Sequence, residues 1–389
     1  MASEARTAGT GEAPGTGRVL AFDIARGVAV FGMIVIHVQK HWGQQEPWFG
    51  LPNLFLSVIG GPLAAPEFML VMGASVAWSH RTDARSLAKR GVLMLAAGLA
   101  LNLARGTLPL YLGQAAGVIP ADGIGGFTAW GLTVTVDVFQ LAGTAFLAIA
   151  ALRPLLRHDL AWIGAAIAVT LVAPVLRPIA TGFLPIDGAL GVLWATGRSV
   201  YYPFFPWAVF PLVGMAVGRS VHRSATPERT LLRWGAVGVA AMLAGGLVMG
   251  EQLVTLDTWG YWRLDPPLAL TLTGVALAWT GACVLIARVA AQTRLVRLLV
   301  TWGRGVTRLY VAHWIIVAWG LGYVGYLALP LPATIAAMAV VLVTSDLLAI
   351  RLPAWWAAGA ARARASAGDR DRDPEDDRPM TPGIDAEPA

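Results

Sequence analysis

The chain has 389 residues, of which 56% are hydrophobic, 13% charged and 9% aromatic, with 16 Trp and a formal net charge of +6. So little charge, together with repeated apolar runs of about 20 residues, excludes an ordinary soluble domain and indicates several membrane crossings. The Lys and Arg residues lie in short segments between apolar runs, which argues against a nucleic-acid partner. The single cysteine, Cys283, excludes a disulfide within the chain.

The two ends of the chain differ in composition from the rest. Residues 1–17 are rich in Gly, Ala and Thr and too polar for a signal peptide, so we expect a disordered cytoplasmic N-terminal tail. Residues 18–352 should form one transmembrane domain. Residues 353–389, rich in Arg, Asp, Glu and Pro, are expected to be a disordered, charged cytoplasmic tail.

The apolar runs predict an all-α integral membrane protein with about ten transmembrane helices, so the lipid bilayer is its first partner. The expected helices are 19–38, 55–79, 88–105, 130–152, 160–176, 203–221, 232–250, 267–289, 307–328 and 331–350.

Basic residues are unevenly distributed between the two sets of connecting loops. One set carries 15 Lys and Arg residues and the other set carries 5. Because cytoplasmic loops are enriched in Lys and Arg, this bias places both termini in the cytoplasm. We therefore expect a multi-pass protein of the cell membrane with both ends inside.

The first expected helix carries Asp23, Arg26, His37 and, one turn later, His41. Ionisable residues within a span usually face the bundle interior or a watery cavity. Asp23 can pair with Arg26 three residues on, and Arg26 and His37 share a face about 16 Å apart along the axis. A His at the wet end of a span can exchange a proton near neutrality, which favours a working site. An interfacial role for His37 and snorkelling of Arg26 are the alternatives.

The second expected helix contains Gly60-Gly61-Pro62 and Pro66, which predict a broken or kinked span. Glu67 falls near its middle, so it needs a partner or a proton. Two interpretations remain equally open for Glu67, a carboxylate of the site or a structural counter-ion for Arg26.

Two later spans contribute further polar residues. In the fourth, Asp137 and Gln140 lie three residues apart on one face, and either bond across the bundle or orient a catalytic His. In the sixth, Gly214 and Gly218 predict close helix packing. Arg219 at its cytoplasmic end either contacts a phosphate or only sets the topology.

Near the ninth helix, Arg304 and Arg308 stand close to a helix start, which is a plausible site for the phosphates of a nucleotide carrier. Tyr310 and His313 follow on one face, with a buried neutral His as the alternative to a functional one. His37 and His41 have the spacing of a metal pair, but no third ligand is evident, so we expect no metal.

In chain order, these residues resemble the transmembrane acyltransferase superfamily. The Arg26-x10-His37 spacing is similar to the acyltransferase-three family. Later motifs resemble heparan-α-glucosaminide N-acetyltransferase-like proteins, and together they extend over residues 18–325. They are Pro66-x-Phe68, Met72-Gly73-x-Ser75, Val138-Phe139-Gln140, Pro206-Trp207, Gly214, Gly218-Arg219, Gly303-Arg304 and Leu309-Tyr310-x-x-His313.

The resemblance implies transfer of an acyl group, in particular acetyl from cytoplasmic acetyl-CoA, to a hydroxyl or amine of a sugar or other acceptor on the outer side. His37 matches the catalytic His and Arg26 its motif partner, with Asp23 fixing the helix. Because the glucosaminide branch often places its His further along, His41 is the alternative base.

The remaining candidates would bind substrate. They are Glu67, Asp137, Gln140, Arg219, Arg304, Arg308, Tyr310 and His313. Two further alternatives concern the whole protein. It is either an enzyme or a proton-coupled transporter or flippase, for which the broken second helix and its intramembrane acids would also be suitable. It is also a possible homodimer.

Overall fold

The computed structural model describes residues 19–44, 58–79, 83–121, 123, 125–194, 197, 199–253 and 258–357. All regular elements in these ranges are helical, joined by loops with isolated β-bridges. The predicted all-α class is therefore confirmed. The expected N-terminal tail lies outside the described residues. The final helical stretch continues to Ala357, five residues into the range expected to be the C-terminal tail.

The helices follow one another along the chain. Their bounds are α1 Leu20–Trp42, α3 Ala65–Ala77, α4 Ala84–Asn102, the π-helical turn η1 Leu103–Thr107, α5 Leu108–Ala115, α6 Ala129–Thr133, α7 Val138–Leu152, α8 Asp159–Leu176, α9 Leu184–Gly191, α10 Phe204–Trp207, α11 Val209–His222, α12 Pro227–Met249, the 3-10 turn η2 Gly250–Leu253, α13 Thr258–Arg263, α14 Pro266–Ala290, α15 Arg294–Arg304, α16 Val306–Val324, α17 Leu331–Asp346 and the π-helical turn η3 Leu347–Arg351.

Eight helical stretches among the described residues are long and apolar enough to cross a membrane. They are Leu20–Trp42, Val58–Ala77, Ala84–Ala115, Asp159–Leu176, Phe204–His222, Pro227–Gln252, Pro266–Ala290 and Leu331–Ala357. The two other expected spans coincide with the shorter apolar helix α7 and with α16. Multiple membrane crossings are thus supported, while the number ten and the N-in/C-in orientation remain predictions.

Two of the expected spans are interrupted. Residues 58–60 are helical, residues 61–64 form turns, and α3 then begins beside Pro66, so the expected break in the second span is present. The expected helix 130–152 is divided into α6 and α7, with Asp137 at the N-cap of α7. The third span is longer than expected, because α4, η1 and α5 continue without a break to Ala115.

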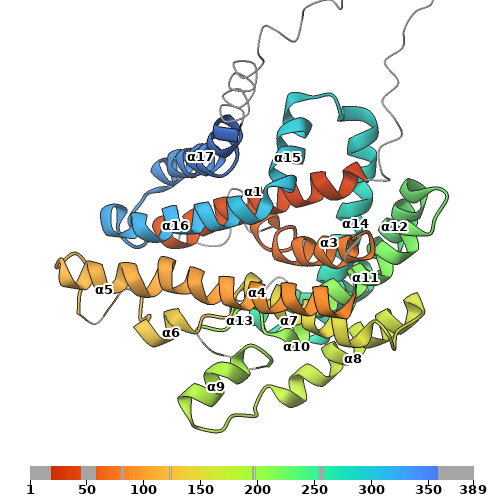
Figure 1. Cartoon of the computed structure of the whole chain (residues 1–389), viewed down its shortest axis with the longest axis horizontal. Coiled ribbons are helices and arrows are strands. Elements are labelled where there is room, and N and C mark those ends of the chain that lie inside the picture. Colours follow the sequence, from red (N-terminus) through yellow and green to blue (C-terminus); the bar gives the residue numbers. More distant parts are fainter. Residues whose placement is uncertain are drawn as a thin grey trace, which may run out of the picture.

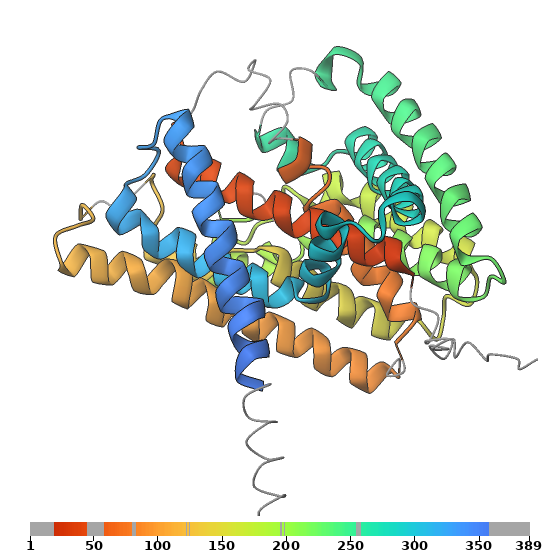
Figure 2. The same cartoon turned by 90° about the horizontal axis from the view of Figure 1, so that it is seen from above.

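Helix α1 is the centre of the bundle. It packs against α3, α14, α15, α16 and α17, and most of its residues are buried. Figure 1 shows α1 and α16 side by side with the long α4–α5 stretch beneath them, and Figure 2 shows α17 crossing over both. Asp23 and Gln39 on α1 are therefore buried against protein.

Helices α1 and α16 run in parallel and are joined at their C-terminal ends. The Leu327 amide donates to the His41 carbonyl at 2.9 Å, and the Leu329 amide donates to the Trp42 carbonyl at 2.8 Å. The Trp42 indole also donates to the Val317 carbonyl at 3.0 Å. These bonds fix which faces of the two helices meet.

Helices α3 and α11 pack closely where glycine residues let their backbones approach, as expected from Gly214 and Gly218. A Cβ atom at Gly214 would lie 2.1 Å from the carbonyl oxygen of Leu70, and one at Gly218 would lie 2.3 Å from that of Ala74. Because these neighbours are backbone atoms, no side-chain movement can make room. The helices can approach this closely only with glycine at these positions.

We expect Gly214→Ala to destabilise the protein by about 1–3 kcal/mol, because the added methyl forces α3 and α11 apart. Gly164→Ala on α8 is the matched control, since a Cβ atom there meets nothing within 4 Å. The measurement is the midpoint of unfolding in detergent. Equal midpoints for the two variants would contradict the packing described here.

Candidate active site

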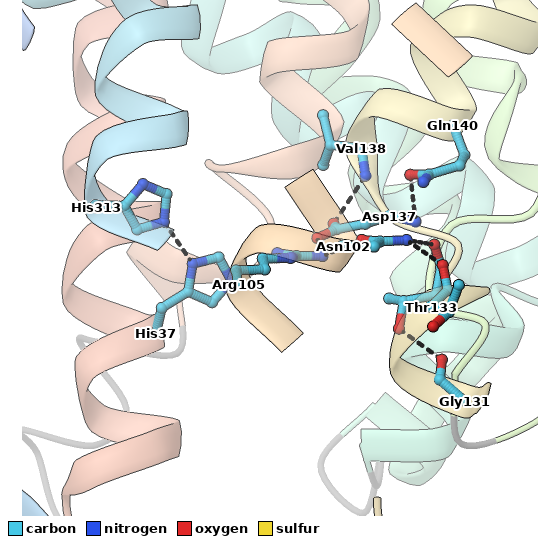
Figure 3. Close-up of polar contacts among 10 residues, drawn as sticks. His37, Asn102, Arg105, Gly131, Thr133, Asp137, Val138, Gln140 and His313 are labelled. Atoms are coloured by element: carbon cyan, nitrogen blue, oxygen red, sulfur yellow. Dashed lines mark hydrogen bonds and ion pairs between the residues drawn. The ribbon is translucent and has the colours of Figure 1, made fainter. Parts of the chain in front are cut away.

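Two histidines meet where α1 and α16 pack. The Nδ1 atom of His37 lies 2.9 Å from Nε2 of His313, and the two rings are coplanar, with centroids 5.2 Å apart. His313 is fully buried, whereas His37 is partly accessible. The two residues are 276 positions apart in the chain. Figure 3 shows this pair beside the polar network of α7 and η1.

The hydrogen bonds determine which ring nitrogens carry protons. His313 Nδ1 lies 3.0 Å from the Leu309 carbonyl oxygen. A carbonyl oxygen can only accept, so His313 Nδ1 carries hydrogen. With both rings neutral, His313 Nε2 is then an acceptor and His37 Nδ1 its donor. The remaining nitrogen, Nε2 of His37, therefore has a lone pair that accepts no hydrogen bond from the part of the chain that the structure describes.

His41 is close to His37 but is bonded differently. Its Nδ1 atom lies 2.9 Å from the His37 carbonyl oxygen, a bond within one helix. Trp314 contacts both rings, with its centroid 4.1 Å from that of His37 and 5.3 Å from that of His41. Of these two neighbouring residues of α1, His37 is therefore the one whose ring bonds to a second histidine side chain.

A buried ion pair stands next to the histidines. Arg105 Nη2 donates to Asp137 Oδ2 at 2.5 Å and to Asn102 Oδ1 at 3.2 Å. The side-chain amide of Asn102 in turn donates to the Thr133 and Thr135 carbonyl oxygens at 3.1 and 2.7 Å. The Arg105 guanidinium also lies over the Trp314 ring, 4.0 Å from its centroid. Trp314 thus contacts both His37 and Arg105.

Arg105 lies in the π-helical turn η1 between α4 and α5. A π turn opens the regular hydrogen-bond pattern of a helix, and such turns are frequent at functional sites. The Ala104 carbonyl in this turn accepts a hydrogen bond from the Trp319 indole of α16 at 3.0 Å. The turn that positions Arg105 is therefore attached to the helix that carries His313.

Asp137 is held at the start of α7 by a capping box. Its Oδ1 accepts from the Val138 amide at 2.7 Å, and its own amide donates to Gln140 Oε1 at 3.1 Å. Asp137 bonds across the bundle, as one of the two sequence interpretations expected. Gln140 instead orients Asp137 locally.

Tyrosines surround this network. Tyr310 is buried, with its ring centroid 5.5 Å from that of His313 and 4.9 Å from that of Phe139. The Tyr201 amide donates to the Val136 carbonyl at 2.9 Å, which places Tyr201 next to Asp137. Burial, followed by the charge of Asp137, raises the pKa of Tyr201 to about 12. Tyr201 is therefore a neutral hydroxyl at physiological pH.

A second polar group lies at the opposite end of α1. Arg26 Nη2 donates to Asp23 Oδ1 at 2.6 Å, which confirms the expected pair. Arg304 Nε lies 3.6 Å from Asp23 Oδ2. Arg26 is about 16 Å along the axis from His37, so this group does not touch the histidines.

Three further predicted residues lie away from the histidines. Glu67 accepts from the Thr280 hydroxyl at 2.9 Å and not from Arg26, so its interpretation as a counter-ion was wrong. Arg219 is already engaged by Asp159 at 3.2 Å and by the Arg157 carbonyl at 2.7 Å. Arg308 is exposed near the start of α16.

Arg105, Asn102 and Trp314 belong to the site but were not predicted from the sequence. Arg105 was the last residue of the expected third helix, 88–105, where a charged residue is typical of the end of a span. The spacing of Asn102 and Arg105, three apart beside apolar residues, is the pattern that could have placed both on one helix face. Within the described ranges, no group of three or more His, Cys, Asp or Glu residues could hold a metal ion.

A family model described as heparan-alpha-glucosaminide N-acetyltransferase, catalytic, matches residues 18–250. No curated protein matches the chain. The matched segment contains His37, His41, Arg105 and Asp137, whereas His313 lies beyond it.

We expect Asp137→Asn to destabilise the protein by about 3–5 kcal/mol, because Asn still caps α7 but leaves the buried charge of Arg105 uncompensated. Asp265→Asn is the control, since its pair with Arg177 is half exposed on the aspartate side and should be worth no more than about 1 kcal/mol. Unfolding in denaturant compares them. A similar loss of stability in both variants would show that the buried Arg105–Asp137 pair stabilises the protein no more than the partly exposed Arg177–Asp265 pair.

Proposed function

The chain belongs to the family of heparan-alpha-glucosaminide N-acetyltransferase catalytic domains and is a multi-pass membrane acyltransferase, and from that premise we propose that it moves an acetyl group from acetyl-CoA to an amine or hydroxyl of a sugar, with His37 as the general base. The observation that carries this proposal is the free Nε2 of His37. Its partner His313 holds the ring in one tautomer.

The arrangement accounts for the proton transfers of the reaction. His37 Nε2 accepts the proton of the acceptor as its nitrogen or oxygen attacks the carbonyl carbon of the thioester. His37 then returns this proton to the departing sulfur as the C–S bond breaks, which gives the acetylated acceptor and free thiol. His313 orients the ring throughout, as the third group of a catalytic triad orients its base.

The opposite end of α1 is suitable for the phosphates of the donor. Arg304 keeps 56% of its side chain exposed despite its contact with Asp23, and Arg308 is exposed one turn further on. Both lie near the junction of α15 and α16, so a donor bound there could extend along α1 toward His37. Arg219 is a weaker candidate because its guanidinium is already paired.

The direction of transfer follows from the loop charges. If Lys and Arg mark the cytoplasmic face, Arg304 lies on the donor side and His37 near the outer side. A membrane-embedded chain then brings donor and acceptor together from opposite faces, and their orientation in one site supplies much of the rate. We further propose the cell membrane as the location of this multi-pass chain.

We expect His37→Ala to lower acetyl transfer by roughly 100- to 10,000-fold, the usual contribution of a general base. His41→Ala should retain activity. The assay measures thiol release from acetyl-CoA with glucosamine as the acceptor, in purified protein of normal thermal stability. A fully active His37→Ala variant, or an inactive His41→Ala variant, would refute the choice between the two histidines.

The role of His313 has its own test. His313→Leu should reduce the maximal rate, because nothing then accepts from His37 Nδ1, while His313→Gln offers an amide oxygen and should restore part of it. Both variants should retain binding of acetyl-CoA. Equal rates for Leu and Gln would argue that His313 does not orient the base.

The orientation can be tested by labelling. In a Cys283→Ala background, Ser86→Cys should be protected from a membrane-impermeant maleimide in intact cells, and Thr181→Cys should react. Ser86 lies in the first turn of α4, at the end next to the loop set rich in Lys and Arg, and Thr181 lies in the opposite loop set. The reverse labelling pattern would invert the proposed direction of transfer.

A further inference from the structure

The two terminal nitrogens of the Arg105 guanidinium differ in their hydrogen bonds. Nη2 donates to both Asp137 and Asn102. Nη1 is buried and has no hydrogen-bond partner among the described residues. Only 8% of the residue is exposed. A buried charged donor left without an acceptor is costly, so this nitrogen indicates a position for a ligand atom that accepts hydrogen bonds.

The position lies within reach of the proposed base. The guanidinium carbon of Arg105 is 4.0 Å from the centroid of the Trp314 ring, and the centroid of the His37 ring is 4.1 Å from Trp314. The guanidinium carbon of Arg105 and the centroid of the His37 ring therefore lie no further apart than the sum of these two distances. A carbonyl group held by Arg105 is therefore close to a nucleophile whose proton His37 accepts.

The charge of the site favours a neutral acceptor atom over a permanent anion. Asp137 already neutralises Arg105 at 2.5 Å, and both residues are buried. A carboxylate or phosphate bound at Nη1 would leave at least one net negative charge in this low-dielectric region. A carbonyl oxygen adds no charge when it binds and gains negative charge only as the nucleophile attacks.

We propose that Nη1 of Arg105 binds the carbonyl oxygen of the acyl group and stabilises the negative charge that forms on it during transfer. The inference rests on the proposed function. As the new bond to carbon forms, the carbonyl π electrons move to oxygen, where Arg105 donates its hydrogen bond. They return as the C–S bond breaks and the sulfur takes the proton from His37. A fixed donor at the developing charge is among the strongest contributions to catalysis.

Asp137 and Asn102 are positioning residues in this arrangement. They hold Nη2, and thereby aim Nη1, without contacting the acyl group. Figure 3 shows Arg105 between the histidine pair and these two residues. The capping box at Asp137 and the two backbone acceptors of Asn102 keep both groups rigid. Preorganised donors of this kind need no rearrangement during the reaction.

The test compares two unreactive analogues of acetyl-CoA. In one, a methylene group replaces the thioester sulfur and leaves a ketone; the other is the ethyl thioether of coenzyme A, which lacks the carbonyl oxygen. The wild-type protein should prefer the ketone by roughly 10-fold, the effect of one hydrogen bond to a charged group. Displacement of radiolabelled coenzyme A from purified protein measures both.

Arg105→Lys keeps a charge for Asp137, and the double variant Arg105→Gln/Asp137→Asn removes both charges, so the result does not depend on one variant folding. Each should bind the two analogues equally and lose most of its maximal rate, with little change in the KM for the acceptor. Arg177→Lys, in an ion pair with Asp265 outside the site, should keep the preference.

A ketone preference that persists in both Arg105 variants overturns the inference and leaves His37 as the base. A raised acceptor KM with the preference intact also overturns it, and assigns Arg105 to the acceptor instead. If the wild-type protein binds neither analogue nor coenzyme A, the proposed donor fails, and this inference fails with it.

Discussion

The site depends on one ion pair held away from water. Burying Arg105 or Asp137 alone would cost several kcal/mol, so each is tolerated in the bundle only because the other is there. Their pairing joins η1 to the start of α7, and Trp314 and Trp319 join α16 to the same turn. The histidines on α1 and α16 take their surroundings from this attachment. A polar network inside an apolar bundle thus decides which side chains of distant segments meet.

The helices were predictable because burial in lipid requires long apolar runs, and every expected range contains a helix. The interruption before α7 was not predicted, because residues 134–136 are Val, Thr and Val, and these continue the apolar run without a Gly or Pro to end the helix. Asp137 and Gln140 nevertheless have the spacing of a capping box, which is readable from sequence. The apolar runs therefore predicted the positions of the spans well, but they predicted poorly the residues at which individual helices begin and end.

The site was predicted only in part. His37, Asp137, Tyr310 and His313 were each identified as polar residues in apolar helices, and the structure brings all four together. Sequence spacing could not show that His37 and His313 bond to each other, because 276 positions separate them. Arg105 was missed for a different reason, since a charge at the end of an apolar run resembles a boundary until the π turn carries the helix past it.

The joined ends of α1 and α16 limit how the bundle can open. Backbone bonds from Leu327 and Leu329 to the last turn of α1 make the two helices a single rigid unit there. We therefore expect the imidazoles of His37 and His313 to move together when neighbouring segments move. The bond from the Trp319 indole to the Ala104 carbonyl attaches η1 to α16 as well, so the Arg105 guanidinium is tied to the same unit as the two imidazoles. Any opening of the bundle that leaves these bonds intact therefore keeps the imidazoles and the guanidinium at a constant spacing.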